Sequence, residues 1–450
     1  MTLTRLFLVA TLVPSLALAV SPTLYDTYDF NPLEHLAGIA PYFEPNDPPR
    51  SPTPPDGCTV TKAAYLVRHA AINATIPMSG GVIYRLWLSF RHGYHHPSLR
   101  KNTLQELGKL EASQLGVEVS FRYPNLEAPR NVWSSTAERT VVSAESFIRG
   151  YETSDNSIKL VQIYESEEGG ANTLTPYDSC PVYSSSAGSK QSQQYLSRWS
   201  KPYLARLNHV FSSFNFTAND LVGMLELCGY ETVIRGSSPF CSLDLFPPDA
   251  WLSFEYTQDI QYFYNTGYGQ PASGYIGFPW MNTTMSLLSS DGGPNSQDIY
   301  ISFTHRELPP TVLVAMGLFN NTEFVGGNPN NSMPLDRINY SRAWVSSYIL
   351  PFLTNIAIER MNCSARSGTY GDAGSSPYYR VLVNDSPQTL PSCYDGPDES
   401  CSSQGLSSWL ADRAAMFGGY STACNTSSEY KNSTDFVNFY QDGGNGSFVG

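Results

Sequence analysis

Two short apolar runs that each end in histidine constrain this chain more than any other feature. The first, residues 63–67, is followed by Arg68 and His69, and the second, residues 299–303, is followed by Thr-His-Arg-Glu at residues 304–307. Apolar runs of about 4–8 residues are typical of buried strands. In open α/β sheets, ligands bind at the carboxyl ends of the strands. One Arg-His pair alone would indicate only a strand ending in solvated residues, but two such ends predict one site assembled from distant segments.

The N-terminal segment is typical of an export signal. Residues 1–19 combine a basic residue, Arg5, with an apolar run too short to span a bilayer and small residues at positions 17 and 19. The remaining length of about 430 residues suggests two to three domains. A formal net charge of −13 argues against nucleic acid or an anionic membrane as a partner. No later run approaches the ~20 apolar residues of a membrane span.

The eight cysteines predict disulfides rather than a metal site. An even number in an exported chain favours four disulfides, and none stands in a CxxC pair or in a Cys/His cluster with zinc spacing. We therefore expect no metal and no cofactor. Spacing leaves the pairing open, although Cys228/Cys241 and Cys393/Cys401 are local neighbours. Eleven N-x-S/T sequons predict N-linked glycans at a subset of these sites.

Shifts in composition and periodicity divide the rest of the chain. We expect a proline-rich N-terminal arm at residues 20–57 and a polar tail at residues 425–450. Strand-like and helical patterns predict an α/β core, and a Ser-, Tyr- and Asn-rich stretch predicts an inserted, mainly helical subdomain. The core would comprise residues 58–151 and 281–424, and the insert residues 152–280.

Two predicted helices matter for the argument. Residues 135–138 read S-T-A-E, a capping-box pattern that opens a helix after the strand at residues 131–135. Arg139 falls in the first turn of this helix, where free backbone N–H groups and the helix dipole favour an anion, although an ordinary solvated arginine fits the pattern as well. The apolar periodicity of residues 342–361 predicts a further helix.

Arg68-His69, Arg139 in its capped helix, and His305 with a following carboxylate together resemble the histidine acid phosphatase family, particularly its fungal phytase-like members. The resemblance extends over about residues 30–425, including residues 35–43, 221–232 and 381–385. It implies a phosphoglycerate-mutase-like open sheet with an inserted, mainly helical subdomain, and the substrate between them. It also implies four disulfides: Cys58–Cys363, Cys180–Cys424, Cys228–Cys241 and Cys393–Cys401.

The resemblance also implies a chemistry. His69 would attack phosphorus and become transiently phosphorylated, which requires a neutral imidazole aimed in line with the leaving group. Arg68, Arg139 and His305 would hold the phosphoryl oxygens, since the guanidinium fork suits phosphate geometry. A carboxylic acid beside His305 would protonate the leaving alcohol.

The sequence departs from the family motif Arg-His-Gly-x-Arg-x-Pro. Ala70, Ile72 and Ala74 replace the glycine, the second arginine and the proline, and an arginine, Arg306, separates the distal histidine from Glu307. Losing one phosphate-clamping arginine could cost ~2–4 kcal/mol of transition-state stabilisation. We expect Arg306 to return the cation missing at position 72 and Glu307 to act as the proton donor. The alternative is that Arg306 points to solvent and the site is crippled.

A second segment matches the letters of the family motif better. Residues 91–97 read R-H-G-Y-H-H-P, but only Cys58 and the pair Arg68-His69 have the spacing of the family's first strand. We therefore prefer His69 as the nucleophile, and expect the sequon at Asn73, close behind it, to be unoccupied or turned away. The other histidines either line the cleft or are solvated: His92, His95 and His96.

These features predict a secreted acid phosphomonoesterase that acts on a small phosphate ester through a phosphohistidine intermediate. A dedicated phytase is less favoured, because basic residues in residues 72–102 are sparse: Arg85, Arg91, Arg100 and Lys101. Two alternatives stay open. One is an enzyme of the same fold whose altered clamp serves non-phosphatase chemistry. The other is a non-catalytic protein with an anion site built from Arg68, Arg139 and His305.

Overall fold

The computed structural model describes most of the chain. Apart from Phe30 and Asn31, the described residues belong to one compact unit that starts at Pro32. No helix among them is long and apolar enough to cross a membrane. The described residues are 30–43, 50–72, 106–151, 157–165, 171, 173–291, 296–322, 332–364, 377–426 and 440.

A mixed sheet forms the centre of this unit, with the strand order β3-β2-β4-β1-β5-β6-β7 and with β8 paired to β6. The first four strands are mutually parallel, so their carboxyl ends meet at one edge. The parallel strands are β1 (Cys58–Arg68), β2 (Asn131–Ser135), β3 (Lys159–Ile163) and β4 (Ile299–Thr304). The antiparallel strands are β5 (Asn355–Cys363), β6 (Pro377–Val383), β7 (Ser386–Gln388) and β8 (Cys401–Ser402).

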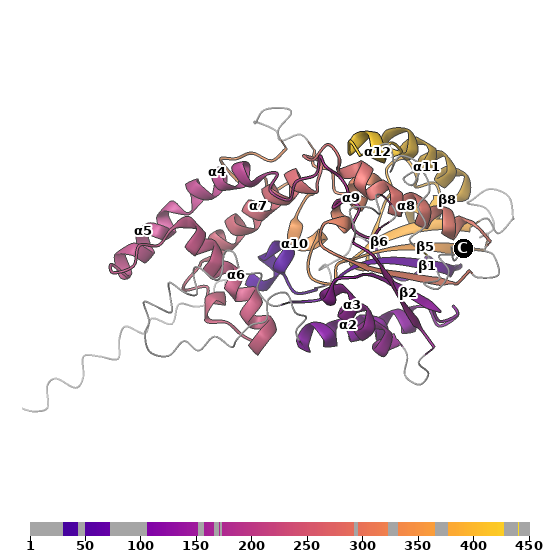
Figure 1. The fold of residues 1–450 in the computed structure, drawn as a ribbon, viewed down its shortest axis with the longest axis horizontal. Coiled ribbons are helices and arrows are strands. Elements are labelled where there is room, and N and C mark those ends of the chain that lie inside the picture. Colours follow the sequence, from indigo (N-terminus) through magenta and orange to yellow (C-terminus); the bar gives the residue numbers. More distant parts are fainter. Residues whose placement is uncertain are drawn as a thin grey trace, which may run out of the picture. The chain divides into compact units, whose positions relative to one another are not determined.

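Helices pack on both faces of the sheet (Figure 1). Alternate residues of β1 therefore join different cores: Leu66 packs in the cluster that includes Met281 and Val312, and Val67 in the cluster that includes Phe147. Burial on both faces explains why β1 and β4 read as continuous apolar runs. One face carries α2 (Glu106–Arg122) and α3 (Glu138–Tyr151), and the other carries α8 (Ser273–Ser289), α9 (Leu308–Met316) and α11 (Ser403–Phe417).

Four longer helices lie to the left of the sheet in Figure 1 and fall within the predicted insert at residues 152–280. Helix α8 runs across the predicted end of that insert and packs against α9. The division into core and insert stays a prediction. The four helices are α4 (Ser189–Trp199), α5 (Lys201–Val210), α6 (Ala218–Arg235) and α7 (Pro248–Asn265). The short helices are η1 (Pro32–His35), η2 (Ala37–Ile39), η4 (Pro239–Cys241), α10 (Ser346–Ile349), η5 (Pro397–Glu399) and α12 (Tyr420–Ala423).

The helix predicted at residues 342–361 is wrong. Only α10 is helical there, and β5 follows it between β1 and β6. Ile356 and Ile358 face one core, whereas Ala357 and Met361 face the other. Unlike β1 and β4, β5 has buried polar residues such as Asn355 and Glu359 within its apolar run, so its pattern also fits a helical template. Pairing with β1 and β6 makes this segment a strand.

The structure contains the same four disulfides that the resemblance implies, and none of the cysteines is free. Cys58 and Cys363 are direct register partners on β1 and β5, so this bond ties the start of the first strand to the end of the fifth. Several predicted features lie outside the described residues: the export signal, the segment at residues 91–97 and the sequon at Asn73.

Candidate active site

The two strand ends singled out in the sequence meet in the structure. β1 and β4 are parallel neighbours, with Arg68 opposite Thr304, and the backbone N–H of His69 donates to the carbonyl of Thr304 at 2.9 Å. His69 and His305 therefore leave the sheet at the same edge. Their ring centroids are 5.7 Å apart with an interplanar angle of 68°. Segments far apart in the sequence thus form one site.

His69 has the electronic state that a nucleophile needs. Its Nδ1 lies 2.9 Å from the carbonyl oxygen of Ala70, and because a carbonyl only accepts, Nδ1 carries the proton and donates. The lone pair is therefore on Nε2, which has no hydrogen-bond partner among the described residues. Burial, reinforced by the nearby charge of Arg68, lowers the pKa of His69 well below its usual value. The imidazole is thus neutral and able to attack.

Arg68 is buried but incompletely paired. Its Nη1 donates to the carbonyls of Gly38 at 2.6 Å and Leu350 at 2.5 Å, and its guanidinium carbon lies 4.5 Å from the centroid of the Phe352 ring. Burial lowers the pKa of Arg68 to about 10, so the group stays charged near neutral pH. Nε is buried and has no partner within the described part of the chain. A buried donor without a partner is a place that an anion can satisfy.

A chain of hydrogen bonds holds the second histidine. Nε of Arg139 donates to Nδ1 of His305 at 3.1 Å, so Nδ1 accepts and Nε2 carries the proton. Nε2 then donates to Glu165 at 2.9 Å. Arg139 is the second residue of α3, and its side chain contacts His305. His305 is held in one tautomer by one cation and one carboxylate.

Glu165 was not among the predicted site residues. It lies two positions after β3, and its Oε1 also accepts from the backbone N–H of Ala137 at 3.0 Å. Burial favours its neutral form, but the hydrogen bonds from His305, Ser135 and Ala137 and the charge of His305 together lower the pKa of Glu165 to about 2. The capping box predicted at residues 135–138 does not have its expected hydrogen bonds, because the Ser135 hydroxyl donates to Thr140 at 2.9 Å. The strand-end rule that identified His69 would also have identified Glu165.

Arg306 and Glu307 form an ion pair beside this site, with Nε and Oε1 2.9 Å apart. The Glu307 side chain is 19% exposed, and burial favours its neutral form, but the charge of Arg306 lowers its pKa below the usual value. The Arg306 side chain is 48% exposed and lines a cavity of about 380 Å³. It therefore faces a cavity that is open to solvent on one side and lies beside the strand ends.

The Ile72 side chain does not take over the role of the arginine that the family motif has at this position. Its side chain is 6% exposed and belongs to the apolar cluster that contains Ala112 and Leu115 of α2. A side chain at this position therefore packs against the helix that covers one face of the sheet.

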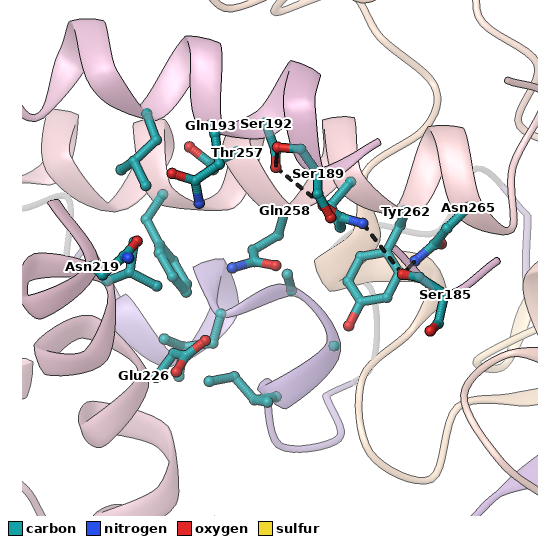
Figure 2. A pocket seen from close by; sticks show the side chains of 18 of the residues that line it. Ser185, Ser189, Ser192, Gln193, Asn219, Glu226, Thr257, Gln258, Tyr262 and Asn265 are labelled. Carbon is teal, nitrogen blue, oxygen red and sulfur yellow. Dashed lines mark hydrogen bonds between the residues drawn. The ribbon is translucent and has the colours of Figure 1, made fainter. Parts of the chain in front are cut away.

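The cavity beside Arg306 is bounded mainly by α4, α6, α7 and η2 (Figure 2). Its wall includes Gly38, whose carbonyl accepts from Arg68, so the cavity adjoins the strand-end site. Glu226 of α6 also lines it, and burial raises the pKa of this carboxyl to about 7. Nothing in the local sequence pattern distinguishes Glu226 from an ordinary helix-surface residue, which explains why it was missed.

Potential metal ligands come together at one place in the described residues, Cys393, Asp395 and Cys401. The two cysteines form a disulfide, so their sulfurs cannot act as thiolate ligands. The strand-end site has histidines and arginines but only one ionised carboxylate in direct contact with His305, a composition that suits an anion better than a metal cation.

The chain is similar to known phosphatases in sequence and in fold. A family model described as the histidine phosphatase superfamily (branch 2) matches residues 88–384. The acid phosphatase PHO1 of Komagataella pastoris is 27% identical, with 83% of this chain and 82% of that protein covered. The phytase PHO112 of Candida albicans is 24% identical, with 94% and 93% covered. The crystal structure of the phytase from D. castellii has the same fold, with a TM-score of 0.78 at 22% identity and 94% of both chains covered.

The predicted α/β fold class is therefore confirmed. The family match begins at residue 88, after His69, and includes Arg91 and His92. It does not decide between the two Arg-His pairs. Of the two pairs, Arg68-His69 stands at the end of β1 beside His305, whereas Arg91-His92 lies outside the described residues.

Proposed function

The chain belongs to branch 2 of the histidine phosphatase superfamily, and we propose that it is a secreted acid phosphomonoesterase that uses His69 as its nucleophile. The observation that carries this proposal is the state of His69, a neutral imidazole at the sheet edge that also holds Arg68 and His305. Among the described residues, nothing is hydrogen-bonded to its Nε2 lone pair. The named relatives, acid phosphatases and phytases, are phosphoric monoester hydrolases and support the enzyme class.

In the first step, Nε2 of His69 attacks phosphorus and the bond from phosphorus to the alcohol oxygen breaks. Nε of Arg68, which has no partner among the described residues, and the remaining donors of Arg139 stabilise the phosphoryl oxygens as negative charge develops on them. Glu307 gives a proton to the departing alkoxide. In the second step, water attacks phosphorus, the bond to His69 breaks, and Glu307 takes the proton of that water.

Arg306 connects the clamp to the acid. While Arg306 pairs with Glu307, the carboxyl is held ionised and cannot give a proton. When a phosphate ester binds, the arginine turns to the phosphate, its pairing with Glu307 weakens and the pKa of Glu307 rises toward its usual value. In this proposal Arg306 takes over the role of the arginine that Ile72 replaces.

Secretion is part of the proposal because two features support it. Four disulfides are typical of proteins that fold outside the cytosol, and residues 1–19 have the pattern of an export signal. We expect N-linked glycans at a subset of the sequons.

Trapping the intermediate tests the proposal. The protein is mixed with ³²P-labelled p-nitrophenyl phosphate and quenched, and the acid-labile phosphate is mapped to a peptide. We expect the label on His69, and His69→Ala to lose the label and to lower kcat by ~10⁴-fold or more. His209→Ala, on the exposed surface of α5, is the matched control and keeps both. Label on His92, or unchanged turnover by His69→Ala, would contradict the assignment.

The same experiment separates a second candidate function, an anion-binding protein without turnover. Burial of Ile72 in the apolar cluster favours this candidate, since the described residues that follow β1, up to Ile72, include no second clamp arginine. Tight binding of inorganic phosphate with no label and no product would support it. Arg306→Ala distinguishes the two functions further: in the enzyme we expect kcat to fall by about 10²-fold, with Arg337→Ala as the control.

A further inference from the structure

We propose that the cavity beside the strand-end site holds the leaving group of the substrate, and that this group is uncharged and rich in hydroxyls, so that the preferred substrates are monophosphate esters of sugars or polyols. This inference rests on the proposed phosphatase function and specifies its substrate class. It concerns the wall formed mainly by α4, α6 and α7, which meets the proposed catalytic machinery at Arg306 (Figure 2).

The position of the cavity relates it to the alcohol side of the ester. Gly38 lines the cavity and its carbonyl holds Arg68 at 2.6 Å, and Arg306, which follows His305 directly, lines it as well. A phosphate bound by Arg68 beside His69 thus lies next to this space. The alcohol portion of the same ester must extend away from phosphorus, and the cavity receives it.

The wall of the cavity offers neutral hydrogen-bonding groups that have no partner in the described part of the chain. Gln193 of α4, Asn219 of α6 and Gln258 of α7 make no side-chain hydrogen bond with any described residue, and Figure 2 shows them around one space. Each amide offers two donors and one acceptor, the complement of hydroxyls that both donate and accept. A ligand with several hydroxyls can satisfy all three amides at once.

Asn265 adds a buried acceptor to this wall. The residue is 7% exposed, its Nδ2 donates to the carbonyl of Ser185 at 3.3 Å, and its Oδ1 is buried without a hydrogen-bond partner in the described structure. Buried polar atoms in folded proteins normally have a partner. A ligand hydroxyl that donates to Oδ1 would satisfy this atom, so the cavity is built for a polar ligand.

The charges of the described part of the wall favour a ligand without several phosphates. Among the described residues that line the cavity, Arg306 is the only basic one, and Glu226 is a carboxylic acid that faces the same space. A ring bearing several phosphates would bring many negative charges against one cation. The volume of about 380 Å³ lies at the small end of the range of ~300–1,000 Å³ for small-molecule sites. One sugar-sized group without further phosphates matches both limits.

A substrate panel tests the inference. Purified protein is assayed with glucose 6-phosphate, p-nitrophenyl phosphate and phytate at acidic pH. We expect kcat/KM for glucose 6-phosphate to exceed that for phytate by about 10-fold or more. Gln193→Leu and Gln258→Leu should lower the ratio of kcat/KM for glucose 6-phosphate to that for p-nitrophenyl phosphate by about 10-fold each. Gln194 is the exposed neighbour of Gln193 on α4 and lies outside the cavity wall, so Gln194→Leu is the control and leaves this ratio unchanged.

The outcomes separate this inference from the proposed function. The inference alone would be overturned if the protein hydrolysed p-nitrophenyl phosphate but had equal kcat/KM for glucose 6-phosphate and phytate. It would also be overturned if the protein hydrolysed p-nitrophenyl phosphate and the Gln193 and Gln194 substitutions had equal effects. No turnover of any ester would overturn the proposed function. In that case calorimetry decides: tighter binding of glucose 6-phosphate than of inorganic phosphate, weakened by Gln193→Leu, supports the cavity assignment, and equal binding rejects it.

Discussion

The strand-end site and the neighbouring cavity use polar groups in opposite ways. At the strand ends the second histidine is fully paired: His305 has one nitrogen bonded to Arg139 and the other to Glu165. In the cavity, the amides of Gln193 and Gln258 have no partner within the described chain. These hydrogen bonds fix the orientation of the side chains that, in the proposed mechanism, act on the phosphoryl group. Unpaired neutral groups leave the wall ready for a ligand.

Two glutamates express the same contrast in their pKa values. Burial acts on both, but at the strand ends the hydrogen bond from His305 lowers the pKa of Glu165 to about 2. In the cavity burial dominates and raises the pKa of Glu226 to about 7, with Arg306 opposing the shift only in part. One region keeps a carboxylate charged and the other keeps a carboxyl neutral. Chemistry and recognition are thus assigned to electrostatically different places.

The largest effect is expected from breaking the paired side of the comparison. Arg139→Ala removes the donor that holds His305 and a cation that faces the phosphoryl group, so kcat should fall by ~10²–10³-fold. Steady-state kinetics with p-nitrophenyl phosphate measures it. Arg149→Ala, at the exposed end of the same helix, is the control and leaves kcat within about twofold. Equal losses in the two variants would mean that α3 stability, rather than the site, explains the effect.

Adding a cation to the strand-end site tests whether that region can accept one. Ile72→Arg restores the residue of the family motif, but it places a charge in an apolar cluster. We expect the free energy of unfolding to fall by about 3 kcal/mol, measured by urea denaturation. Ile72→Leu, which keeps the apolar volume, should cost less than about 1.5 kcal/mol. An Ile72→Arg protein with unchanged stability and higher kcat would show that the loop can turn toward the phosphate.

Glu165→Gln removes the charged half of the comparison and has a defined pH dependence. The folded-state pKa of Glu165 is about 2, below the usual 4.5. The hydrogen bond from His305 to the ionised carboxylate therefore stabilises the fold above pH 4.5, and this stabilisation is lost as the pH falls toward 2. The variant should be less stable by on the order of 2 kcal/mol at pH 6, with the difference vanishing near pH 2. Urea unfolding at several pH values measures this. A pH-independent difference would contradict it.

The smallest effect is expected at Glu226, whose contribution to stability changes with pH in the opposite direction to that of Glu165. A folded-state pKa raised to about 7 means that the neutral carboxyl stabilises the fold below pH 4.5 and that this contribution is lost as the pH rises through 7. Glu226→Gln should remove that loss. Above pH 7 the variant should also hydrolyse fructose 1,6-bisphosphate a few-fold better relative to glucose 6-phosphate, because Glu226 no longer repels the second phosphate. Arg306 and Tyr230, which face Glu226, are unchanged in the Glu226→Gln variant. The same ratio in both proteins would contradict the role of Glu226.

Much of the fold could be predicted from the sequence because the relevant signals are local. The apolar runs before His69 and His305 correspond to β1 and β4, and the helix expected after residue 135 corresponds to α3. β5 could not be predicted in this way, since buried polar residues such as Asn355 and Glu359 interrupt its apolar run and leave neither a continuous run nor a strict alternation. Its identity depends on hydrogen bonds to β1 and β6, which no local pattern contains.

The sequence by itself determined which chemical groups stand at the strand ends, because a buried apolar run followed by polar residues places those residues at the edge of a sheet wherever the strand pairs. Only the tertiary structure decided which partner each group has. Glu165 meets His305 because β3 lies beside β2, and Ile72 packs against α2 instead of facing the site. The free amides of the cavity likewise result from three helices that leave a space between them. Pairing and burial arise from the packing of distant segments, so they are properties of the assembled fold.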